Sequence, residues 1–418
     1  MSRIFLAATG RHIGCGLAAC LIVFAGTPAA LGQLTVSADF PGGSAEVLVI
    51  DVDSEIASIE VRPKLRYDRG WPCWWYFRVD GAVAGQRLNV TVRANQEPFR
   101  EGRTLSPAWA LPRRAAISSD NVHWSQTDPG EAQRDRITYP VLAPATTFWL
   151  AWGPPFQSAH ADELLALIAA KVEPATPFEL ARTREGRAVN GIRLGNPDAG
   201  DVVWIQARQH AWESGSSWVA EGFVRWVACD DPAAVRLRER TQIVFIPIMD
   251  VDNVQLGAGG KDATPRDHNR DWCTEPIYPE VAAAQVLIGQ LIDAGRLRVF
   301  LDLHNPAAGD KLPFYFGPSD YENLPEVERS NYDRFLSHTV RRVGEPIGFL
   351  PHFRSSDYIK TKEERDRVSR HWVAGRGGPD LTALTLETSW DTDHGTISGY
   401  RKVGQGLARA LADFLTDE

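Results

Sequence analysis

The sequence predicts an antiparallel β-sandwich followed by an α/β domain with a mixed sheet flanked by helices. Between about 34 and 155, short apolar runs alternate with Gly, Pro and Asp breaks. Beyond that region, apolar strand-like runs alternate with amphipathic helical segments, which is typical of a largely buried sheet covered by helices. We therefore expect a sandwich domain over 33–155 and a second domain over 156–418.

The strands of the first domain are predicted from a period of two. In "QRLNVTVRA", Leu88, Val90 and Val92 point one way and Asn89 and Thr91 point the other, as in a half-buried strand. Similar runs include "AEVLVIDV", "CWWYFRVDG" and "TTFWLAWG". No group of His, Cys or carboxylates in this region suggests a site.

The second domain is predicted from the order of its apolar runs. Four of them lack polar alternation, which indicates buried strands, and amphipathic segments separate them. The expected strands are 202–207, 242–248, 298–304 and 381–388, and the expected helices are 161–172, 215–228, 278–295, 328–343 and 403–415.

Residues 1–32 are predicted to be a secretory signal peptide, because basic residues precede a continuous apolar run and small residues follow it. The apolar run, 13–26, is shorter than the roughly 20 residues that a membrane span needs. An alternative is a lipoprotein signal ending at Cys20, which the apolar "LIVF" after Cys20 disfavours. We expect an exported protein, periplasmic or extracellular, with no further membrane association.

The composition excludes some classes of partner. The formal charge is −8, and loss of Arg3 and Arg11 with the signal peptide makes it −10, so binding to nucleic acid or anionic lipid is not expected. Three Cys remain after cleavage, and their spacing favours buried thiols over a disulfide framework. Fourteen Trp is a high number, and several indoles near a cleft would suit a peptide- or sugar-binding surface.

Polar side chains follow the predicted strands where ligands gather in α/β sheets. His210 and Glu213 follow the first strand, His304 ends the third and Glu387 ends the fourth. Two imidazoles and one carboxylate with an open position form a catalytic zinc site, in which Glu387 would be the base. Asp302 lies on the same face as His304 and would support one of the two histidines.

Each of these residues also has a structural interpretation. His210 and Glu213 could be a surface pair, His304 a histidine at a strand end, and Glu387 a buried partner of a nearby Arg. In "RDHNRDW", Asn269 and Arg270 suit a carboxylate such as a peptide C-terminus, but a loop salt bridge is the alternative.

The ordered motifs "ARQHAWESGSSWVAEGF", "IPIMDVDNV", "RDHNRDW", "FLDLHNP" and "ALTLETSW" resemble those of the zinc metallocarboxypeptidases. With "SADFPGGSAEVL", "CWWYFRVDG" and "TTFWLAWGPPFQ" upstream, the chain is similar to the cytosolic carboxypeptidase branch, which includes deglutamylases and bacterial relatives. The resemblance implies a peptidase with one zinc per chain. It places His210, Glu213 and His304 on the zinc ligands and Glu387 on the general base.

The resemblance also implies that Asn269 and Arg270 grip the C-terminal carboxylate of a peptide or protein substrate. The family's carbonyl-polarising Arg has no exact counterpart, so we expect Lys261, one residue out of register, or Arg266 to supply that charge. Tyr358 is the candidate for a Tyr that closes over the substrate. His268 replaces the Leu that usually precedes Asn-Arg.

Substrate choice is the least determined part of the site. Arg370 or Lys360 would select an acidic terminal residue, and a solvated charged helix is the alternative for their segment. The sequence is also compatible with an amide hydrolase acting on peptidoglycan stem peptides. A third hypothesis is a zinc-bearing but inactive binding module whose functional surface is the sandwich with its Trp residues.

Overall fold

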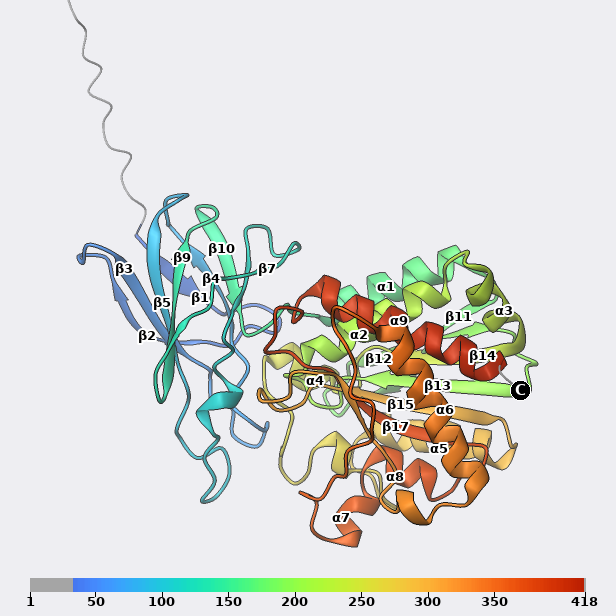
Figure 1. The fold of residues 1–418 in the computed structure, drawn as a ribbon. Helices are drawn as coiled ribbons and strands as arrows, with labels where there is room; N and C mark the ends of the chain where they lie inside the picture. Colours follow the sequence, from blue (N-terminus) through green and yellow to red (C-terminus); the bar gives the residue numbers. More distant parts are fainter. Residues whose placement is uncertain (1–32, 417–418) are drawn as a thin grey trace, which may run out of the picture.

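The computed structural model of the chain describes residues 33–416 (Figure 1). The predicted signal peptide and Cys20 therefore lie outside the described residues. The strands of an N-terminal unit lie between Thr35 and Ala151, and the first helix of the next unit starts at Ser158. The domain division at 155 and 156 stays a prediction.

The N-terminal unit consists of two five-stranded sheets, with strand orders β1-β4-β10-β6-β7 and β2-β3-β5-β9-β8. In β5, Leu88, Val90 and Val92 are buried and Asn89 and Thr91 are half-buried, so the predicted alternation is confirmed. The elements are β1 Thr35–Ser37, β2 Glu46–Asp51, β3 Ala57–Arg62, β4 Tyr76–Asp80, β5 Arg87–Arg93, η1 Pro107–Trp109, β6 Ala116–Ser118, β7 Ser125–Gln126, β8 Glu131–Ala132, β9 Arg136–Leu142 and β10 Thr147–Ala151.

One strand pair corrects the prediction of an antiparallel sandwich. β3 and β5 pair in parallel, with Ile59 opposite Val90. The chain between them crosses to the other sheet as β4 before it returns. Because parallel neighbours need such a crossover, two strands can share a direction although each one shows the alternation of a half-buried sheet.

The second unit is built on a seven-stranded mixed sheet with the order β11-β12-β14-β13-β15-β17-β16. The four predicted strands form its parallel centre, β14-β13-β15-β17, and antiparallel strands flank them. This arrangement confirms the predicted mixed sheet. The strands are β11 Ala175–Arg182, β12 Ala188–Gly195, β13 Asp201–Ala207, β14 Thr241–Ile246, β15 Leu297–His304, β16 Phe314–Phe316 and β17 Thr382–Glu387.

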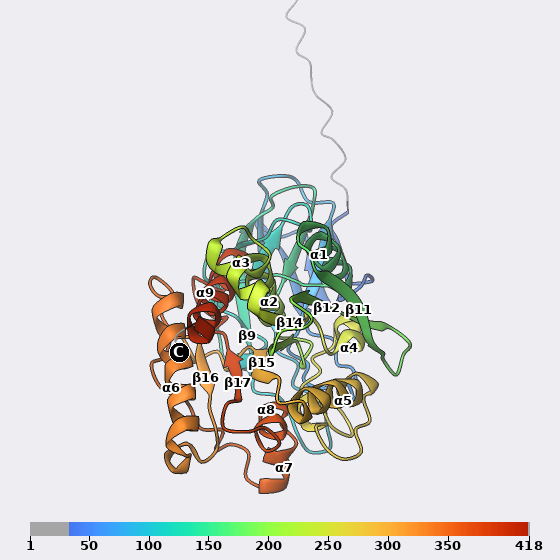
Figure 2. The same cartoon turned by 90° about the vertical axis from the view of Figure 1, so that its right-hand side faces the viewer.

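Helices cover both faces of this sheet, with α2 and α9 on one face and α5 and α8 on the other (Figures 1 and 2). All five predicted helices are present. The helices are α1 Ser158–Lys171, α2 Ser214–Val227, α3 Pro232–Arg240, α4 Val251–Leu256, η2 His268–Arg270, α5 Pro279–Asp293, η3 Tyr321–Asn323, α6 Glu326–Val343, α7 Lys362–Asp366, α8 Ser369–Ala374 and α9 Ile397–Thr416.

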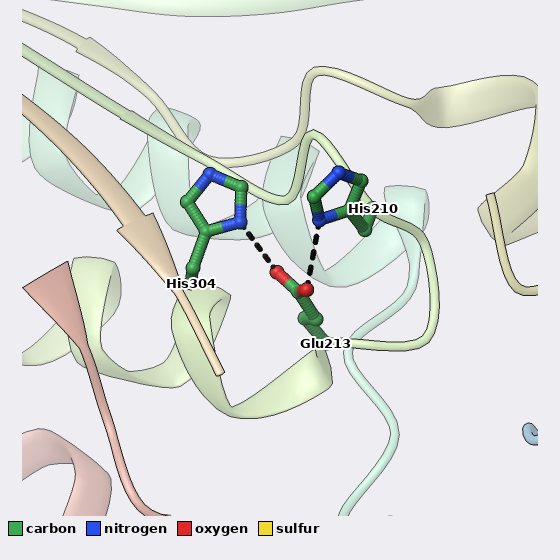
Figure 3. Close-up of side chains that lie close together, drawn as sticks. All are labelled: His210, Glu213 and His304. Carbon is green, nitrogen blue, oxygen red and sulfur yellow. Dashed lines mark hydrogen bonds and ion pairs between the residues drawn. The ribbon is translucent and has the colours of Figure 1, made fainter. Parts of the chain in front are cut away.

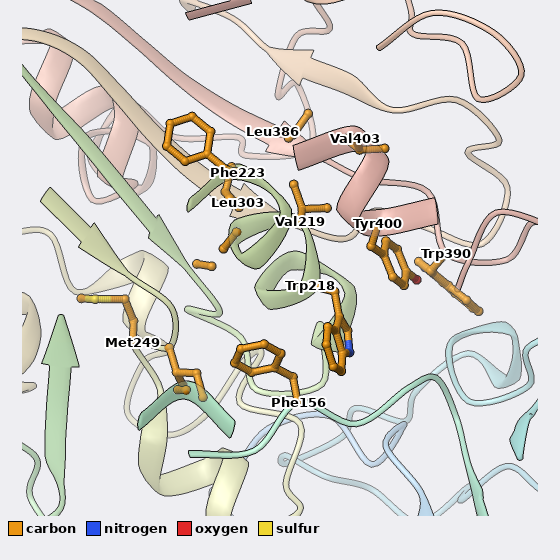
Figure 4. Close-up of a cluster of buried hydrophobic side chains, with 14 of the residues drawn as sticks. Phe156, Trp218, Val219, Phe223, Met249, Leu303, Leu386, Trp390, Tyr400 and Val403 are labelled. Atoms are coloured by element: carbon orange, nitrogen blue, oxygen red, sulfur yellow. The ribbon is translucent and has the colours of Figure 1, made fainter. Parts of the chain in front are cut away.

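The core between the sheet and helices α2 and α9 is apolar and closely packed. Leu303 of β15 and Leu386 of β17 lie against Val219 of α2 and Val403 of α9, as Figure 4 shows. Gly404 brings α9 so close to α2 that a Cβ there would lie 1.9 Å from the carbonyl oxygen of Val219. This contact fixes α2, and with it the turn from which α2 begins.

No helix among residues 33–416 has the length and hydrophobicity of a membrane span. The three cysteines in this part of the chain are free thiols. Cys73 is buried as expected, but Cys229 and Cys273 are only half-buried, which corrects the prediction of three buried thiols.

Candidate metal centre

A buried arginine shapes the turn that carries two of the candidate ligands. The chain leaves β13 at Ala207, and Arg208 adopts a left-handed φ of 66°. Its Nε donates a hydrogen bond of 2.7 Å to the carbonyl oxygen of Ala211, inside the turn. Burial lowers the pKa of Arg208 to about 9, an effect that the charges of Glu213 and Asp250 oppose. The turn is therefore held from within by its own side chain.

His210, Glu213 and His304 converge, as Figure 3 shows. The carboxylate of Glu213 lies between the two rings, with Oε1 2.8 Å from Nδ1 of His210 and Oε2 2.8 Å from Nδ1 of His304. Their candidate ligand atoms all lie within 4.8 Å of one another, and all three residues are buried. The structure thus brings the three predicted ligands together.

The donor set fits a zinc ion. Two imidazole nitrogens and a carboxylate oxygen are the ligands of catalytic zinc sites. Burial raises the pKa of Glu213, but the charges of His210 and His304 outweigh this effect and hold it below its ordinary value. Burial lowers the pKa of His304, but the charges of Asp302 and Glu213 outweigh this effect and raise it well above its ordinary value. A divalent cation bound between the two rings would neutralise the Glu213 carboxylate.

Carboxylates lie behind both histidines. Asp302 Oδ2 is 2.8 Å from Nε2 of His304 and also accepts hydrogen bonds from Gln209 and Ser369, each at 2.6 Å. The histidine that Asp302 supports, which the sequence left open, is therefore His304. Asp267 Oδ1 lies 3.5 Å from Nε2 of His210. Such carboxylates orient a ligand ring and fix the nitrogen that faces the metal.

Glu387 lies beside the metal centre because β15 and β17 pair in parallel with His304 opposite Glu387. Its Oε2 is shielded from solvent and has no hydrogen-bond partner, so an ion pair with a nearby Arg does not occupy that atom. Burial is the main cause that raises the pKa of Glu387 to about 8. A carboxyl group with this pKa can hold a proton near neutral pH.

The two candidates for the polarising cation have different environments. Arg266 bonds to Asp271 and donates 2.6 Å to the carbonyl oxygen of Glu275, away from the metal ligands. Lys261 Nζ lies 3.5 Å from Nε2 of His210. Its charge also lowers the pKa of Glu387, so the two side chains are electrostatically coupled. Lys261 is thus the cation that the structure brings to the centre.

Asn269 and Arg270 lie on η2 next to the ligands. Asn269 Nδ2 is 3.2 Å from Nε2 of His304, and its Oδ1 accepts a hydrogen bond of 2.9 Å from the Ser369 amide. The guanidinium of Arg270 is half-buried and donates 2.8 Å to the carbonyl oxygen of Asn269. Tyr358 lies near Arg270 and helps to raise its pKa, and 56% of the Tyr358 surface is exposed.

Arg370 is buried on α8, beneath the loop that carries Tyr358. Its Nε donates 3.2 Å to the Gly317 carbonyl oxygen, and its NH2 donates 2.7 Å to Ser356 Oγ. Burial lowers the pKa of Arg370 to about 10, whereas the charges of Tyr358 and Glu387 raise it. Lys360 is exposed and bonds to the carbonyl oxygen of Asp357, so Arg370 is the more central of the two cations.

His268, the departure just before Asn269, forms a buried ion group that the sequence did not predict. Its Nε2 is 2.6 Å from Glu280 Oε1, and its Nδ1 is 3.7 Å from Asp250 Oδ2. The ring stacks on Tyr278 with centroids 3.8 Å apart. Burial lowers the pKa of His268, but these carboxylates outweigh that effect and raise it to about 9. A charged imidazole thus anchors η2.

Tryptophans from the N-terminal unit pack around Trp212, which lies in the sequence between the candidate ligands His210 and Glu213. Trp212 is 1% exposed, and its ring centroid lies 5.6 Å from that of Trp109 and 5.2 Å from that of Trp152. These tryptophans therefore pack in the interior and do not form an exposed binding surface. Only the three-dimensional structure could show that the sandwich supports the ligand turn.

Comparison with known proteins agrees with this geometry. Residues 163–275 match the zinc carboxypeptidase family, and residues 36–152 match the cytosolic carboxypeptidase N-terminal domain. The two matches make the chain similar to the zinc carboxypeptidases in both of its units. This family match includes His210 and Glu213 but ends before His304 and Glu387, which the fold adds to the site.

Among the family's proteins, human cytosolic carboxypeptidase 2 is 26% identical over 375 residues, which cover 82% of this chain and 40% of that protein. An uncharacterized protein of Zymomonas mobilis is 22% identical over 77% of this chain and 79% of its own length. The chain thus spans less than half of its human relative.

Two solved structures share the fold. A metallo-carboxypeptidase of Burkholderia cenocepacia superposes with a TM-score of 0.76 at 23% identity, covering 91% of this chain and 98% of that one. A Pseudomonas aeruginosa metallo-carboxypeptidase in complex with (2-guanidinoethylmercapto)succinic acid gives a TM-score of 0.73 at 20% identity, over 91% and 99% of the chains.

Proposed function

We propose that this protein is a zinc-dependent carboxypeptidase that removes C-terminal amino acids from peptides or proteins. One observation carries the proposal: Glu387, whose Oε2 has no partner, lies opposite His304 on the next strand, beside three convergent metal ligands. A base beside an open metal position is the arrangement that hydrolyses an amide.

The residues that would hold zinc are His210, Glu213 and His304. When bound there, zinc supplies a Lewis acid that polarises a carbonyl group and acidifies water. Glu387 as the carboxylate would take a proton from the attacking water and later deliver it to the departing amine nitrogen, and its raised pKa favours holding that proton between the two transfers. Lys261, whose charge acts on Glu387, would supply a positive charge for the carbonyl oxygen that becomes negative.

Asn269 and Arg270, which we call the carboxylate clamp, would decide which peptide bond lies at the metal centre. Arg270 can pair through two parallel N–H groups with the substrate's free carboxylate, and Asn269 lies next to it. Tyr358, which contacts Arg270, is exposed enough to close over a bound residue. The charge of Arg370 beneath them favours an acidic terminal side chain, which is our proposal for substrate preference.

The decisive experiment compares wild-type protein with Glu387→Gln in zinc content and in cleavage of a peptide library, read by mass spectrometry. We expect the variant to keep its zinc and to lose turnover by about 10²- to 10⁴-fold, the usual contribution of a general base. Glu60→Gln in the sandwich, which removes a carboxylate paired with Arg93, is the matched control. Near-wild-type hydrolysis by Glu387→Gln would refute the mechanism.

The library also separates the alternatives. Release of one C-terminal residue supports a carboxypeptidase, and preferential release of Glu or Asp supports the role of Arg370. Cleavage confined to cell-wall fragments would support a peptidoglycan amide hydrolase. A protein that holds zinc but cleaves nothing would be a binding module.

We further propose that the protein is exported after removal of 1–32. The basic start and the apolar run that follows support this. The mass of the mature protein, with or without a lipid on Cys20, is the test.

A further inference from the structure

Asn305, the residue after the candidate ligand His304, connects the segments that carry the ligands and the candidate base. It is 2% exposed, and both the oxygen and the nitrogen of its side-chain amide have partners. Oδ1 accepts a hydrogen bond of 3.0 Å from the Ser216 amide in the first turn of α2. Nδ2 donates 2.5 Å to the carbonyl oxygen of Thr388, the residue after Glu387. Because a backbone N–H only donates and a carbonyl oxygen only accepts, these partners fix the orientation of the amide.

The start of α2 explains why an acceptor is needed there. The side chain of an N-cap residue usually accepts a hydrogen bond from one of the first backbone amides of its helix. Glu213 is the N-cap of α2 but makes no such bond, because its carboxylate lies between His210 and His304. Asn305 supplies the acceptor instead, and the Ser216 amide that it binds also donates 3.0 Å to the Glu213 carbonyl oxygen. The carboxylate of Glu213 is thus released from capping and can face a metal ion.

The nitrogen of the Asn305 amide holds the segment that follows the candidate base. The Thr388 amide donates 2.9 Å to the His304 carbonyl oxygen, which continues the pairing of β15 with β17 beyond Glu387. The Asn305 side chain then binds the Thr388 carbonyl oxygen. Both backbone polar groups of Thr388 are therefore bound to residues 304 and 305, and this fixes the position of Glu387 beside the ligands.

The surroundings of Asn305 fit its side chain closely. A Cβ on Gly215 would lie 2.8 Å from Nδ2 of Asn305 and 2.5 Å from Cζ of Tyr400, so the chain approaches the amide this closely only because residue 215 is glycine. Ser and Ala are too short to reach both partners of Asn305, and Leu, which has a similar size, has no polar atom. An Asn side chain is therefore specifically suited to this position.

We propose that Asn305 is a positioning residue that sets the separation between the metal ligand Glu213 and the base Glu387. The inference rests on the proposed function, because this separation matters only if Glu387 acts on a group held at the metal centre. Asn305 acts through the backbone of Ser216 and Thr388. Without its two hydrogen bonds, the ligand turn and the end of β17 would move independently, so zinc affinity and kcat would fall. KM would change little, because it depends on the carboxylate clamp.

The test compares Asn305→Leu, which removes both hydrogen bonds, with Asn305→Asp, which keeps an acceptor for the Ser216 amide but loses the N–H donor to Thr388. Competition with a chelator measures zinc affinity, and a peptide that the wild type cleaves gives kcat and KM. We expect Asn305→Leu to lower zinc affinity about 10- to 100-fold, as when groups that orient ligands are lost. Its kcat should fall about 10- to 100-fold, as for a misplacement on the order of 1 Å, with little change in KM. Asn305→Asp should recover most of the zinc affinity and keep the low kcat.

Asn95 in the sandwich offers a matched control. It is 1% exposed, and its side-chain amide likewise accepts from a backbone amide, that of Glu97 at 2.9 Å, and donates to a backbone carbonyl oxygen, that of Pro63 at 3.1 Å. Asn95→Leu should lose similar stability in urea and leave zinc affinity and kcat unchanged.

Equal zinc affinity and kcat in Asn305→Leu and Asn95→Leu would overturn the proposal and make Asn305 a structural residue only. If Asn305→Leu does not fold, Asn305→Asp decides, and an unchanged kcat in that variant would overturn the proposal. A wild-type protein that cleaves no peptide would refute the proposed function. The zinc affinities of the Asn305 and Asn95 variants would then decide alone whether Asn305 positions the ligand turn.

Discussion

Replacing Trp212 by Ala should weaken both the fold and metal binding, because this side chain connects the ligand turn to the sandwich. Trp212 is 1% exposed and lies within 6.4 Å, between ring centroids, of Trp71, Trp109 and Trp152. A buried indole removes about 150–250 Å² from water, worth about 4–6 kcal/mol at 25 cal/mol/Å² as an upper value. Trp→Ala changes in cores cost about 3–5 kcal/mol.

We therefore expect the free energy of unfolding to fall by about 4 kcal/mol, within the range given by this estimate. Because His210 and Glu213 flank Trp212 in the sequence, the space left by the missing indole should also make both ligands more mobile. Zinc affinity should fall on the order of 10- to 100-fold, as when groups that orient ligands are lost. Urea unfolding of the metal-free protein and competition with a chelator measure the two effects separately.

Trp75→Ala is the matched control, since Trp75 is also fully buried but packs on Phe77 and Tyr139 within the sandwich. It should lose similar stability and keep its zinc affinity. If Trp212→Ala binds zinc as tightly as the wild type, or if Trp75→Ala loses affinity equally, the Trp cluster does not support the ligand turn.

Two further predictions concern buried charges. His268→Leu leaves Asp250 and Glu280 without their cation, so we expect the free energy of unfolding to fall by about 3–5 kcal/mol. The KM for peptides should rise and kcat should change less, because η2 positions Asn269 and Arg270, which would bind the substrate carboxylate. An unchanged KM would contradict this. Burial raises the pKa of Glu221, but His160 and the arginines outweigh it, so the folded pKa lies below 4.5. The stability that Glu221 contributes is therefore present above pH 4.5 and is lost as the pH falls through the folded pKa. Urea unfolding of the wild type and of Glu221→Gln at a series of pH values should therefore give free energies of unfolding that become more alike as the pH falls through the folded pKa of Glu221.

The sequence predicted the layers of the fold better than its strand pairing. Alternation at Leu88, Val90 and Val92 depends only on which face of a strand is buried, so it is visible locally. The parallel pairing of β3 with β5 depends on a crossover through the other sheet, which no local pattern records. The hairpin of β11 and β12 was missed because both strands mix polar and apolar positions and are interrupted, β11 by a Pro and β12 by Gly.

For the metal centre, the strand-end rule was sufficient to select the three side chains that converge and to place Glu387, the candidate base, beside them. His304 and Glu387 end neighbouring parallel strands, so their proximity follows from register. Asp267 and Trp212 could not be found in this way, because each acts from behind a ligand through a tertiary contact. The unusual His268 was visible as a departure from the family pattern, but its two carboxylate partners were not.

The sandwich also fixes the loop that carries Lys261, which gives a last prediction. The Trp71 amide donates 3.0 Å to the Lys261 carbonyl oxygen, and the Gly260 amide donates 2.9 Å to that of Arg69. A Cβ on Gly259 would lie 2.1 Å from the Trp71 carbonyl oxygen, so only glycine permits this approach.

A chain limited to 156–418 would lose these hydrogen bonds and expose Trp212, so we expect it to bind zinc more weakly and to show no peptidase activity. Circular dichroism with metal titration is the measurement, and adding the sandwich as a separate chain is the control. A truncated chain with full zinc affinity and activity would show that the catalytic unit forms its site alone. The loss of activity with retained helical content would instead place the defect in loop 259–261 and the ligand turn, because these segments receive their hydrogen bonds and aromatic packing from the sandwich.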